Sequence, residues 1–506
     1  MKQISVLPHL SIDVDGAALD DRMTAALAGV VILSSLGKPS VCELRFTDPP
    51  GPLTAADALT AGKSFRVSVS TEAPALFEGQ VTAIVHRHDP DRGRELFIRG
   101  YDLLHRLRKR QRARVLASTS AGQLARELTS DLGISVESES DGPTLDRIIQ
   151  HRQSDLELLI DVCAAAGLYP TIRGGSLRLL TLNGSGDPVE LELGRNLVEA
   201  RLELNGDLAS SSVKVAGWHP LATGPGHGEA ATARVGRDVS AAVSAGDLGG
   251  IDSRELVDEV AFSGGQADAL AQAELDRRVS SEVVFHGLAE GDARLQPGAR
   301  VAVRGVADQF AGTYVLTEVT HRIEEATGFT SELDSTPIEA RPRPHAAVAT
   351  PGMVTSVNDP DGLGRIQVTL PTYGDVQTGW MPVLGLGAGK GKGLVVLPDV
   401  GDEVLLLLAH EDPDEGIVLG GLYGAGGPKD PGIVGGATRR FSLLTAGGSR
   451  IRIDDHDKSI RIEDPTGSFF ELTPKKATLH SEVDLEISAP GHKVTIKAQS
   501  VDFETA

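Results

Sequence analysis

A glycine-rich segment with two lysines is the first stretch whose residue types could do chemistry. Residues 385–392 read Gly-Leu-Gly-Ala-Gly-Lys-Gly-Lys, a composition similar to loops that hold phosphate groups with backbone N–H groups. The spacing of a phosphate loop is absent, no Ser or Thr follows the lysine, and a strand-like run at 394–397 stands where a helix N-terminus would be needed. We therefore interpret residues 385–392 as a barrel loop and predict no cofactor.

A second cluster, residues 410–415, reads His-Glu-Asp-Pro-Asp-Glu and combines potential metal ligands. Pro413 excludes the helical register in which a zinc protease places its His and Glu. Carboxylates beside a proline are typical of a turn, so we predict no metal site here.

Nucleophilic catalysis finds no support in the sequence. No Gly-x-Ser-x-Gly elbow occurs, and Cys42 and Cys163 lie in apolar runs typical of core positions rather than of a disulfide or a metal site. A pair of scattered carboxylates, as in a glycosidase, would escape this search and is the enzymatic alternative. Our expectation is a protein that is not an enzyme, with no catalytic residues, cofactors or metals.

The whole chain has the composition of a mainly β protein. Its 506 residues are enough for about three or four domains. The 58 glycines and 27 prolines, with only 4% aromatic residues, suit many short strands and turns.

The charge balance bears on partners and location. With 49 basic and 70 acidic residues the formal net charge is −21, which argues against a nucleic-acid surface. We therefore interpret the basic run 106–114 as a solvated face or a subunit contact. No run approaches the roughly 18 apolar residues of a membrane span, and no secretory sequence precedes Leu10. We expect synthesis in the cytoplasm without a signal peptide and export by another machine.

The first 340 residues predict two small β-barrels with helical insertions. Period-two alternation recurs between turn residues. Helix caps occur at Ser120 and Ser154, with ends near Gly133 and Gly167, and a third helix is expected at 265–278. The Gly/Ala/His-rich stretch 219–250 has no period and is interpreted as a flexible loop.

A Pro/Arg linker at 341–350 separates this half from a different domain, 351–424. Its short strands with glycine corners, among them a run at 393–397, predict a five-stranded Greek-key barrel of the OB type. A Gly/Pro-rich hinge at 425–438 follows.

Within residues 439–506 a unit of about eight residues recurs, and apolar and polar side chains alternate in each unit. Each unit contributes only two inward apolar side chains, so one chain cannot form a core and would leave bare strand edges. Several copies winding around one axis would solve both problems and give a needle-like β-prism. An ordinary terminal β-sandwich with short hairpins is the alternative.

Five blocks between 364 and 423 resemble the OB domain of VgrG-type spike proteins. They are Gly364-Arg-Ile-Gln-Val, Gly379-Trp-Met-Pro-Val, the glycine-lysine loop, residues 397–404 and residues 412–423. More loosely, residues 97–107, 154–159, 215–218 and 312–321 resemble blocks of the phage tail hub.

The resemblance implies the homotrimeric spike of a contractile injection system, as in type VI secretion systems, phage tails and phage-tail-like extracellular particles. The hub would join inner tube and baseplate proteins, and the needle would carry a PAAR-type tip protein and effector cargo. Sheath contraction would drive it through the target envelope, which it would touch only transiently, outside the cell that made it. The short needle and the lack of room for a lysozyme domain between Tyr423 and Phe441 favour the extracellular particle.

Two sets of residues follow from this assignment. Val501, Phe503 and Ala506 are predicted to seat the tip protein. The predicted trimer core consists of Ile451, Ile453, Ile460, Ile462, Phe470, Leu472, Leu485, Ile487, Val494 and Ile496. The competing class is an oligomeric β-rich adhesin or carbohydrate-binding protein, which would need aromatic platforms, whereas residues 449–506 of the repeat offer only Phe469, Phe470 and Phe503.

Overall fold

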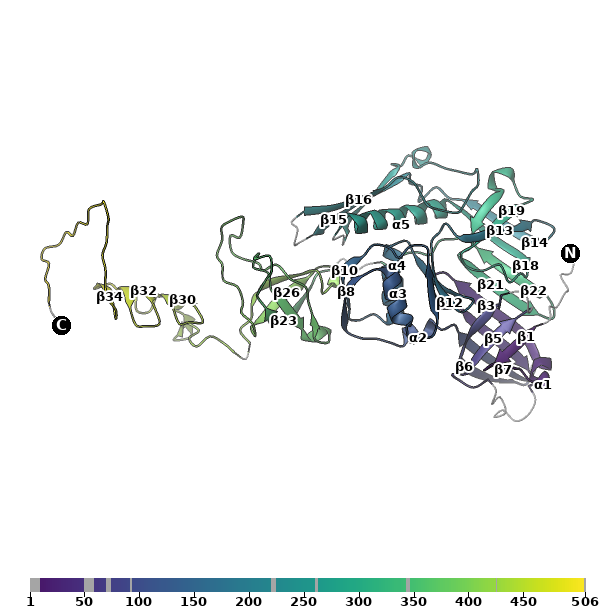
Figure 1. The fold of residues 1–506 in the computed structure, drawn as a ribbon, viewed down its shortest axis with the longest axis horizontal. Coiled ribbons are helices and arrows are strands. Elements are labelled where there is room, and N and C mark those ends of the chain that lie inside the picture. The colour runs from purple at the N-terminus through teal and green to yellow at the C-terminus, as the bar shows by residue number, and fades with distance from the viewer. Residues whose placement is uncertain are drawn as a thin grey trace. The chain divides into compact units, whose positions relative to one another are not determined.

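The computed structural model describes residues 10–49, 59–69, 74–91, 93–219, 224–259, 263–342, 346–424 and 426–504. The chain divides into two compact units, Met1–Gly421 and Leu422–Ala506, each of which is described by itself (Figure 1). Most of the secondary structure is β, as predicted. Within the described ranges, no helix has the length and apolar character needed to span a membrane.

The largest sheet of the first unit combines strands from both ends of the first 340 residues. Because β3 pairs with β21, the two sets of strands that the sequence assigns to separate barrels are continuous in one sheet. The order is β14 (Leu197–Leu204), β18 (Val283–Glu290), β22 (Gly328–Asp334), β21 (Glu318–Glu324), β3 (Leu27–Ser35), β4 (Val41–Thr47), β7 (Gly93–Tyr101), β6 (Phe77–Asp89), β5 (Ser64–Ser68), β1 (Ser11–Val14) and β2 (Ala17–Ala18).

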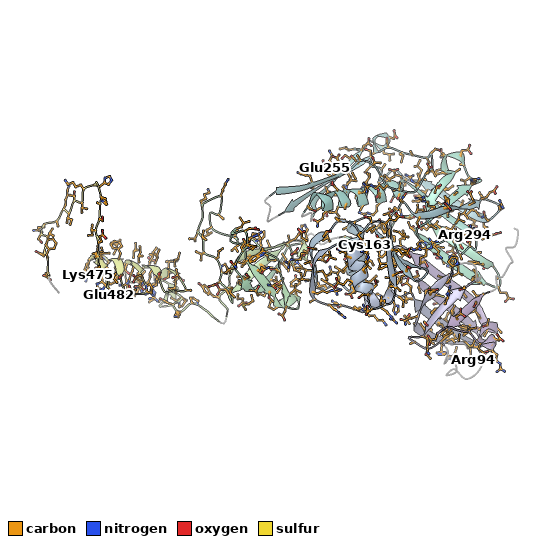
Figure 2. All side chains as sticks on the ribbon, viewed as in Figure 1. Arg94, Cys163, Glu255, Arg294, Lys475 and Glu482 are labelled. Carbon is orange, nitrogen blue, oxygen red and sulfur yellow. The ribbon has the colours of Figure 1, made fainter. Side chains whose placement is uncertain are left out.

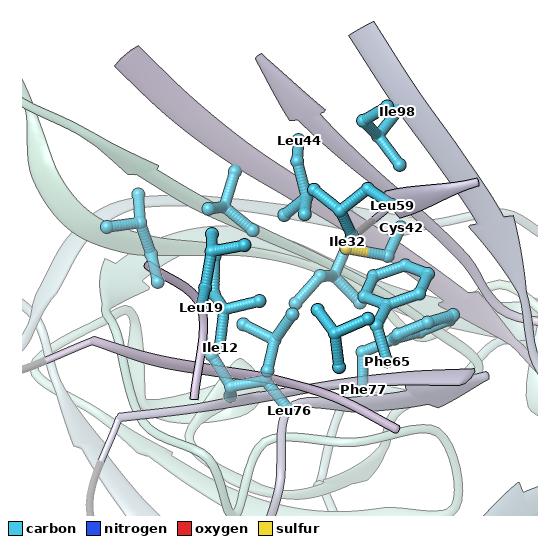
Figure 3. Close-up of a cluster of buried hydrophobic side chains, with 14 of the residues drawn as sticks. Ile12, Leu19, Ile32, Cys42, Leu44, Leu59, Phe65, Leu76, Phe77 and Ile98 are labelled. Carbon is cyan, nitrogen blue, oxygen red and sulfur yellow. The ribbon is translucent and has the colours of Figure 1, made fainter. Parts of the chain in front are cut away.

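Each half of this sheet has its own core. Ile32, Cys42, Leu44 and Ile98 are inaccessible to solvent within the N-terminal cluster (Figure 3), so Cys42 is the core residue that its neighbours predict. The C-terminal cluster includes Phe285 and also draws on the small sheet of β13 (Ser185–Glu192), β19 (Ala299–Arg304) and β20 (Gly312–Val315). Burial of one such side chain contributes about 1.5–3 kcal/mol.

All three predicted helices form, and the two predicted caps, Ser120 and Ser154, are present. They are α3 (Ala121–Thr129), α4 (Asp155–Ala165) and α5 (Gly264–Glu282), and each begins with a reciprocal capping box. Cys163 of α4 is buried in the cluster that α4 shares with α3. The remaining elements here are α1 (Asp21–Ala25), α2 (His105–Arg108), β8 (Arg114–Thr119), β9 (Ser135–Ser138), β10 (Leu145–Gln150), β11 (Tyr169–Arg173) and β12 (Ser176–Leu180).

The flexible loop predicted at 219–250 is wrong in part. Its described portion contains β16 (Gly224–Ala230), which pairs with β15 (Ser212–His219), and β15 pairs on its other side with β17 (Ser253–Glu259). Helix α5 packs on this sheet, and a Cβ on Gly228 would lie 2.1 Å from the backbone of Ala267. The strand escaped prediction because glycines occupy alternate positions where apolar side chains would reveal the period.

Three arginines of the basic run 106–114 have polar partners within the chain. Arg110 binds Asp131 at 2.7 Å, and Arg114 binds the buried Asp155 at 3.0 Å. Arg106 Nε donates to Gln80 Oε1 at 2.8 Å. These contacts engage Arg106, Arg110 and Arg114 within this chain.

The OB region contains a five-stranded sheet ordered β25 (Val376–Gln377), β24 (Gln367–Leu370), β23 (Val348–Ser356), β26 (Glu403–Leu408) and β27 (Gly416–Gly421). Its core includes Val354, Val368, Leu406 and Val418, all nearly inaccessible to solvent. The strand predicted at 393–397 is absent from the structure, since no neighbouring strand of this chain lies beside it.

The cluster at 410–415 lies where the OB region meets the hub. Arg152 binds Glu411 at 2.7 Å and Arg147 lies 3.5 Å from Asp414, whose burial raises its pKa to about 6. His410 Nδ1 lies 2.7 Å from Glu415 Oε2. Within the described residues, no three His, Cys, Asp or Glu side chains are placed to hold a metal ion. The cluster thus joins two parts of the first unit.

The second unit is an antiparallel meander preceded by a small hairpin of β28 (Ile433–Val434) and β29 (Ala437–Thr438). The meander runs through β30 (Arg440–Leu444), β31 (Arg450–Asp454), β32 (Ser459–Glu463), β33 (Phe469–Leu472) and β34 (Ala477–His480). The alternating runs at 483–487, 493–497 and 501–504 are not strands in this structure of one chain. An isolated strand has no partner for its backbone groups, so alternation alone does not produce one.

The capping boxes give a first testable prediction. The backbone N–H of Glu157 donates to Ser154 Oγ, and Ser154 Oγ–H donates to Glu157 Oε2 at 2.8 Å. Ser154→Ala removes both interactions and should lower the free energy of unfolding by about 1 kcal/mol. Urea unfolding measures this, with Ser281→Ala inside α5 as control; equal losses in the two variants would contradict the role of the cap.

Candidate functional site

Cross-strand register places six of the predicted core residues on one face of the β30–β34 sheet. Ile451 lies opposite Ile462, and Ile453 lies opposite Ile460. On the next strand pair, Ile460 faces Leu472 and Ile462 faces Phe470. Directly opposite side chains in an antiparallel pair project to the same side, so these residues form one continuous surface.

Three further residues that the sequence analysis did not name extend this surface. Phe441 and Leu443 of β30 lie opposite Ile453 and Ile451, and Leu479 of β34 lies opposite Phe470. The same period-two alternation could have revealed them. We call the nine residues the apolar face: Phe441, Leu443, Ile451, Ile453, Ile460, Ile462, Phe470, Leu472 and Leu479.

The apolar face is open to solvent in the single chain. Its nine side chains are 39–59% exposed. A contiguous apolar patch on a soluble protein marks an interaction surface, because leaving it in water forgoes the free energy of burial. The geometry therefore provides a binding surface rather than a catalytic one.

The opposite face of the same sheet carries paired charges. Glu463 accepts hydrogen bonds from Arg450 and from Arg461, and Arg461 also lies 3.4 Å from Glu471. The Arg461 guanidinium lies 3.8 Å from the centre of the Phe469 ring, a cation–π contact. Because these charges satisfy one another in water, this face suits solvent and the other one suits a partner.

Asp side chains in the hairpin turns hold the register that makes the two faces. The Asp454 carboxylate accepts from the backbone N–H groups of His456 and Asp457. Asp464 accepts from the N–H groups of three residues of the next turn, 466–468. Such turns are locally encoded, and a slip of one residue would exchange the apolar and charged faces.

The remaining predicted residues are not brought together. Leu485, Ile487, Val494 and Ile496 lie beyond β34, outside any strand, and are 53–69% exposed. Val501 and Phe503 are exposed near the C-terminus, and Ala506 lies outside the described residues. Figure 2 labels Lys475 and Glu482, which bracket β34, the last strand of the sheet. The assignments of trimer core and tip seat stay predictions.

Comparisons with known proteins agree with this architecture. The model of the type VI secretion system/phage-baseplate injector OB domain matches residues 350–423. The structure of the E. coli c3393 protein, described as a component of the type VI secretion system with structural similarity to the T4 bacteriophage tail proteins gp27 and gp5, is 13% identical with a TM-score of 0.55; the match covers 81% of this chain and 99% of that one.

A second similar structure is that of the lidded Francisella PdpA–VgrG complex. It is 7% identical with a TM-score of 0.55, and the match covers 94% of this chain and 81% of that one. No curated protein sequence matches the chain. The fold is that of a VgrG-type spike protein. The model of the Alg8 N-terminal domain matches residues 6–325, more than half of the chain, and the chain belongs to that family.

The charged face predicts how stability depends on pH. Burial raises the pKa of Glu463, but its hydrogen bonds with Arg461 and Arg450 outweigh that effect, so the pKa lies below the ordinary value of 4.5. Glu463 should therefore stabilise the sheet above pH 4.5, and this contribution should disappear as pH falls through the lowered pKa.

The test compares the wild-type chain with Glu463→Gln between pH 7 and pH 3. We expect the variant to be less stable by about 1 kcal/mol at pH 7, with the difference shrinking below pH 4.5. Thermal unfolding followed by circular dichroism provides the measurement. Glu486→Gln, beyond the sheet, is the control and should show no such dependence. A difference independent of pH would contradict the assignment.

Proposed function

We propose that the protein is the central spike of a contractile injection system and that its role is structural and non-enzymatic. The observation that carries the proposal is the apolar face of the β30–β34 sheet, directly downstream of an OB domain of the secretion and baseplate type. Such a sheet needs copies of itself to bury that face, and a spike needs a rigid rod at its end. Several copies that bury their apolar faces against one another would also provide this rigid rod.

The partner for the apolar face is a second and a third copy of the chain. Three sheets around one axis would turn their apolar faces inward and leave the Arg–Glu faces in water. The edge strands β30 and β34, each paired on one side only, would then lie beside edges of neighbouring copies. The runs at 483–487 and 493–497 would gain strand partners in the same way and bring Leu485, Ile487, Val494 and Ile496 to the axis.

The other partners follow from the class of protein. We propose that the hub binds inner tube and baseplate proteins and that the needle carries a PAAR-type tip protein at Val501, Phe503 and Ala506. The PdpA–VgrG complex shows another spike bound to a further protein, which supports cargo as an additional partner. The assembled particle would act outside the producing cell and meet the target membrane only during contraction.

The proposed mechanism is mechanical. Sheath contraction would push the tube and the spike together, and the trimeric prism would concentrate the force on a narrow tip. Paired charges such as Arg461–Glu471 and a dry apolar axis would both resist bending, because each is lost when strands separate. No bond of the target needs to be cleaved for this role.

Charges at the axis should abolish the trimer. Ile462→Asp with Leu485→Asp would bury six carboxylates around one axis, at a cost of several kcal/mol per carboxylate. Light scattering should report a trimer for the full chain, and a monomer for this variant and for a chain truncated after Thr438. A trimer that persists with both aspartates would contradict the core assignment.

A matched control lies in the same sheet. Leu444 is 54% exposed like the core candidates, but its partner Arg450 places it on the charged face. Leu444→Asp should therefore leave the trimer intact. If it dissociates the trimer as strongly as Ile462→Asp, the two faces are not distinguished by assembly.

Removal of residues 501–506 should weaken binding of a PAAR-type tip protein by at least tenfold, about 1.4 kcal/mol, because the exposed apolar contacts at Val501 and Phe503 are lost. Isothermal titration calorimetry measures this, and light scattering checks that the shortened chain is still a trimer. Lys497→Ala is the control. Undiminished binding after the deletion would place the tip elsewhere.

A further inference from the structure

A segment of the OB domain, residues 394–397, has the composition of a strand but no place in a sheet. It reads Leu-Val-Val-Leu, and its side chains are 50%, 80%, 62% and 42% exposed in chain order. The OB core of this domain is otherwise well filled, with Ile366, Val368 and Leu406 inaccessible to solvent. β-Branched residues that face water on a well-packed domain require an explanation beyond chance exposure.

Most of the backbone of the segment is also unpaired. Leu394 N–H donates to Leu386 O at 2.9 Å, and Gly393 at φ +130° turns the chain into the segment. Within the part of the chain that the structure describes, the backbone groups of 395–397 form no hydrogen bond with another backbone group. Pro398 then ends the run, as it would end an edge strand. Exposed side chains and unpaired backbone groups are separate observations, and both indicate a segment that can form a strand with a second segment.

The segment belongs to a loop that leaves the OB sheet beside its edge strand β27. Val383 forms a parallel bridge with Val418, and Leu384 N–H donates to Val418 O at 2.8 Å. After β27 the chain continues through Leu422 and Tyr423, which are 37% and 80% exposed. The loop and the exit of the OB domain thus start from the same edge, and that exit leads to the sheet with the apolar face.

Charge favours another copy of this chain as the partner. Between residues 384 and 398 the only charged side chains are Lys390 and Lys392, whereas the chain as a whole has a net charge of −21. A basic loop on an acidic protein is attracted to neighbouring copies instead of being repelled by them. Copies held together by the apolar face also have their OB domains tethered nearby through the intervening hinge.

We propose that residues 394–397 form a β-strand against the OB domain of a neighbouring copy of this chain, so that three loops close a ring around the collar of the spike. The contact is heterologous, with the loop of one copy on the next, which is the interface type that generates a closed ring. It rests on the proposed trimeric spike but is a different interface from the needle axis. It would bind the copies at the level of the OB domains.

Hydrogen exchange with mass spectrometry on the purified full-length chain tests the proposal. A strand paired along one edge with a neighbouring copy should protect the amides that point to that edge, either Val396 or both Val395 and Leu397, at least tenfold relative to unstructured peptide. A trimer by light scattering in which these amides exchange at unstructured rates overturns the ring contact and leaves the spike intact. A monomer overturns both proposals. Protection that persists in the monomeric Ile462→Asp, Leu485→Asp variant shows pairing within one chain and also overturns the ring contact.

A variant pair gives a second readout. Val395→Asp with Val396→Asp should lower the urea concentration at which the full-length trimer dissociates, because two exposed apolar side chains would carry charges into the contact. Leu363→Asp is the matched control, since Leu363 is 65% exposed on a different loop of the same domain. Equal dissociation midpoints for wild type and both variants would contradict the proposal.

Discussion

The apolar face of the β30–β34 sheet is the constraint on which the rest of the molecule depends. A sheet of five strands has one face stabilised by paired charges such as Arg450–Glu463 and another with nine apolar side chains and nothing to cover them. At roughly 25 cal/mol per Å² of buried apolar surface, covering that face would stabilise this unit. Under the proposed function, this unit would complete its folding by assembly with further copies of the chain.

The first unit shows the opposite condition. Its eleven-stranded sheet and its helices bury their own cores, with Ile32, Phe46 and Phe285 inaccessible to solvent in one chain. Under the proposed function, the first unit would fold alone and the second would complete its structure by association. The ion pairs Arg152–Glu411 and Arg147–Asp414 then join the hub to the OB region within the same unit.

Sequence alone predicted those parts of the fold in which a local pattern determines the structure. Caps at Ser120 and Ser154 gave the helices, and the alternation around Ile451 and Ile462 gave the sheet and most of its apolar face. The prediction failed where glycines conceal the alternation of side chains, and where a strand forms only beside a partner strand. Glycines concealed β16, and the run at 393–397 matches a strand in composition but finds no ladder within its chain. Pairing is a property of two segments, so a period in one of them cannot settle it.

The same limit applies to how much of the candidate site could be predicted from the sequence. Period-two alternation identifies which side chains share a face of the sheet. Both faces of an isolated sheet meet water, so only the charges on one face indicate that the opposite face is the one to be covered. In this chain Glu463 supplies that information: an acid held by two arginines gains little from a further partner, whereas Ile462 beside it gains by leaving water. If the chain assembles as proposed, adjacent residues of opposite character would determine which face is covered, and one strand, β32, contains both.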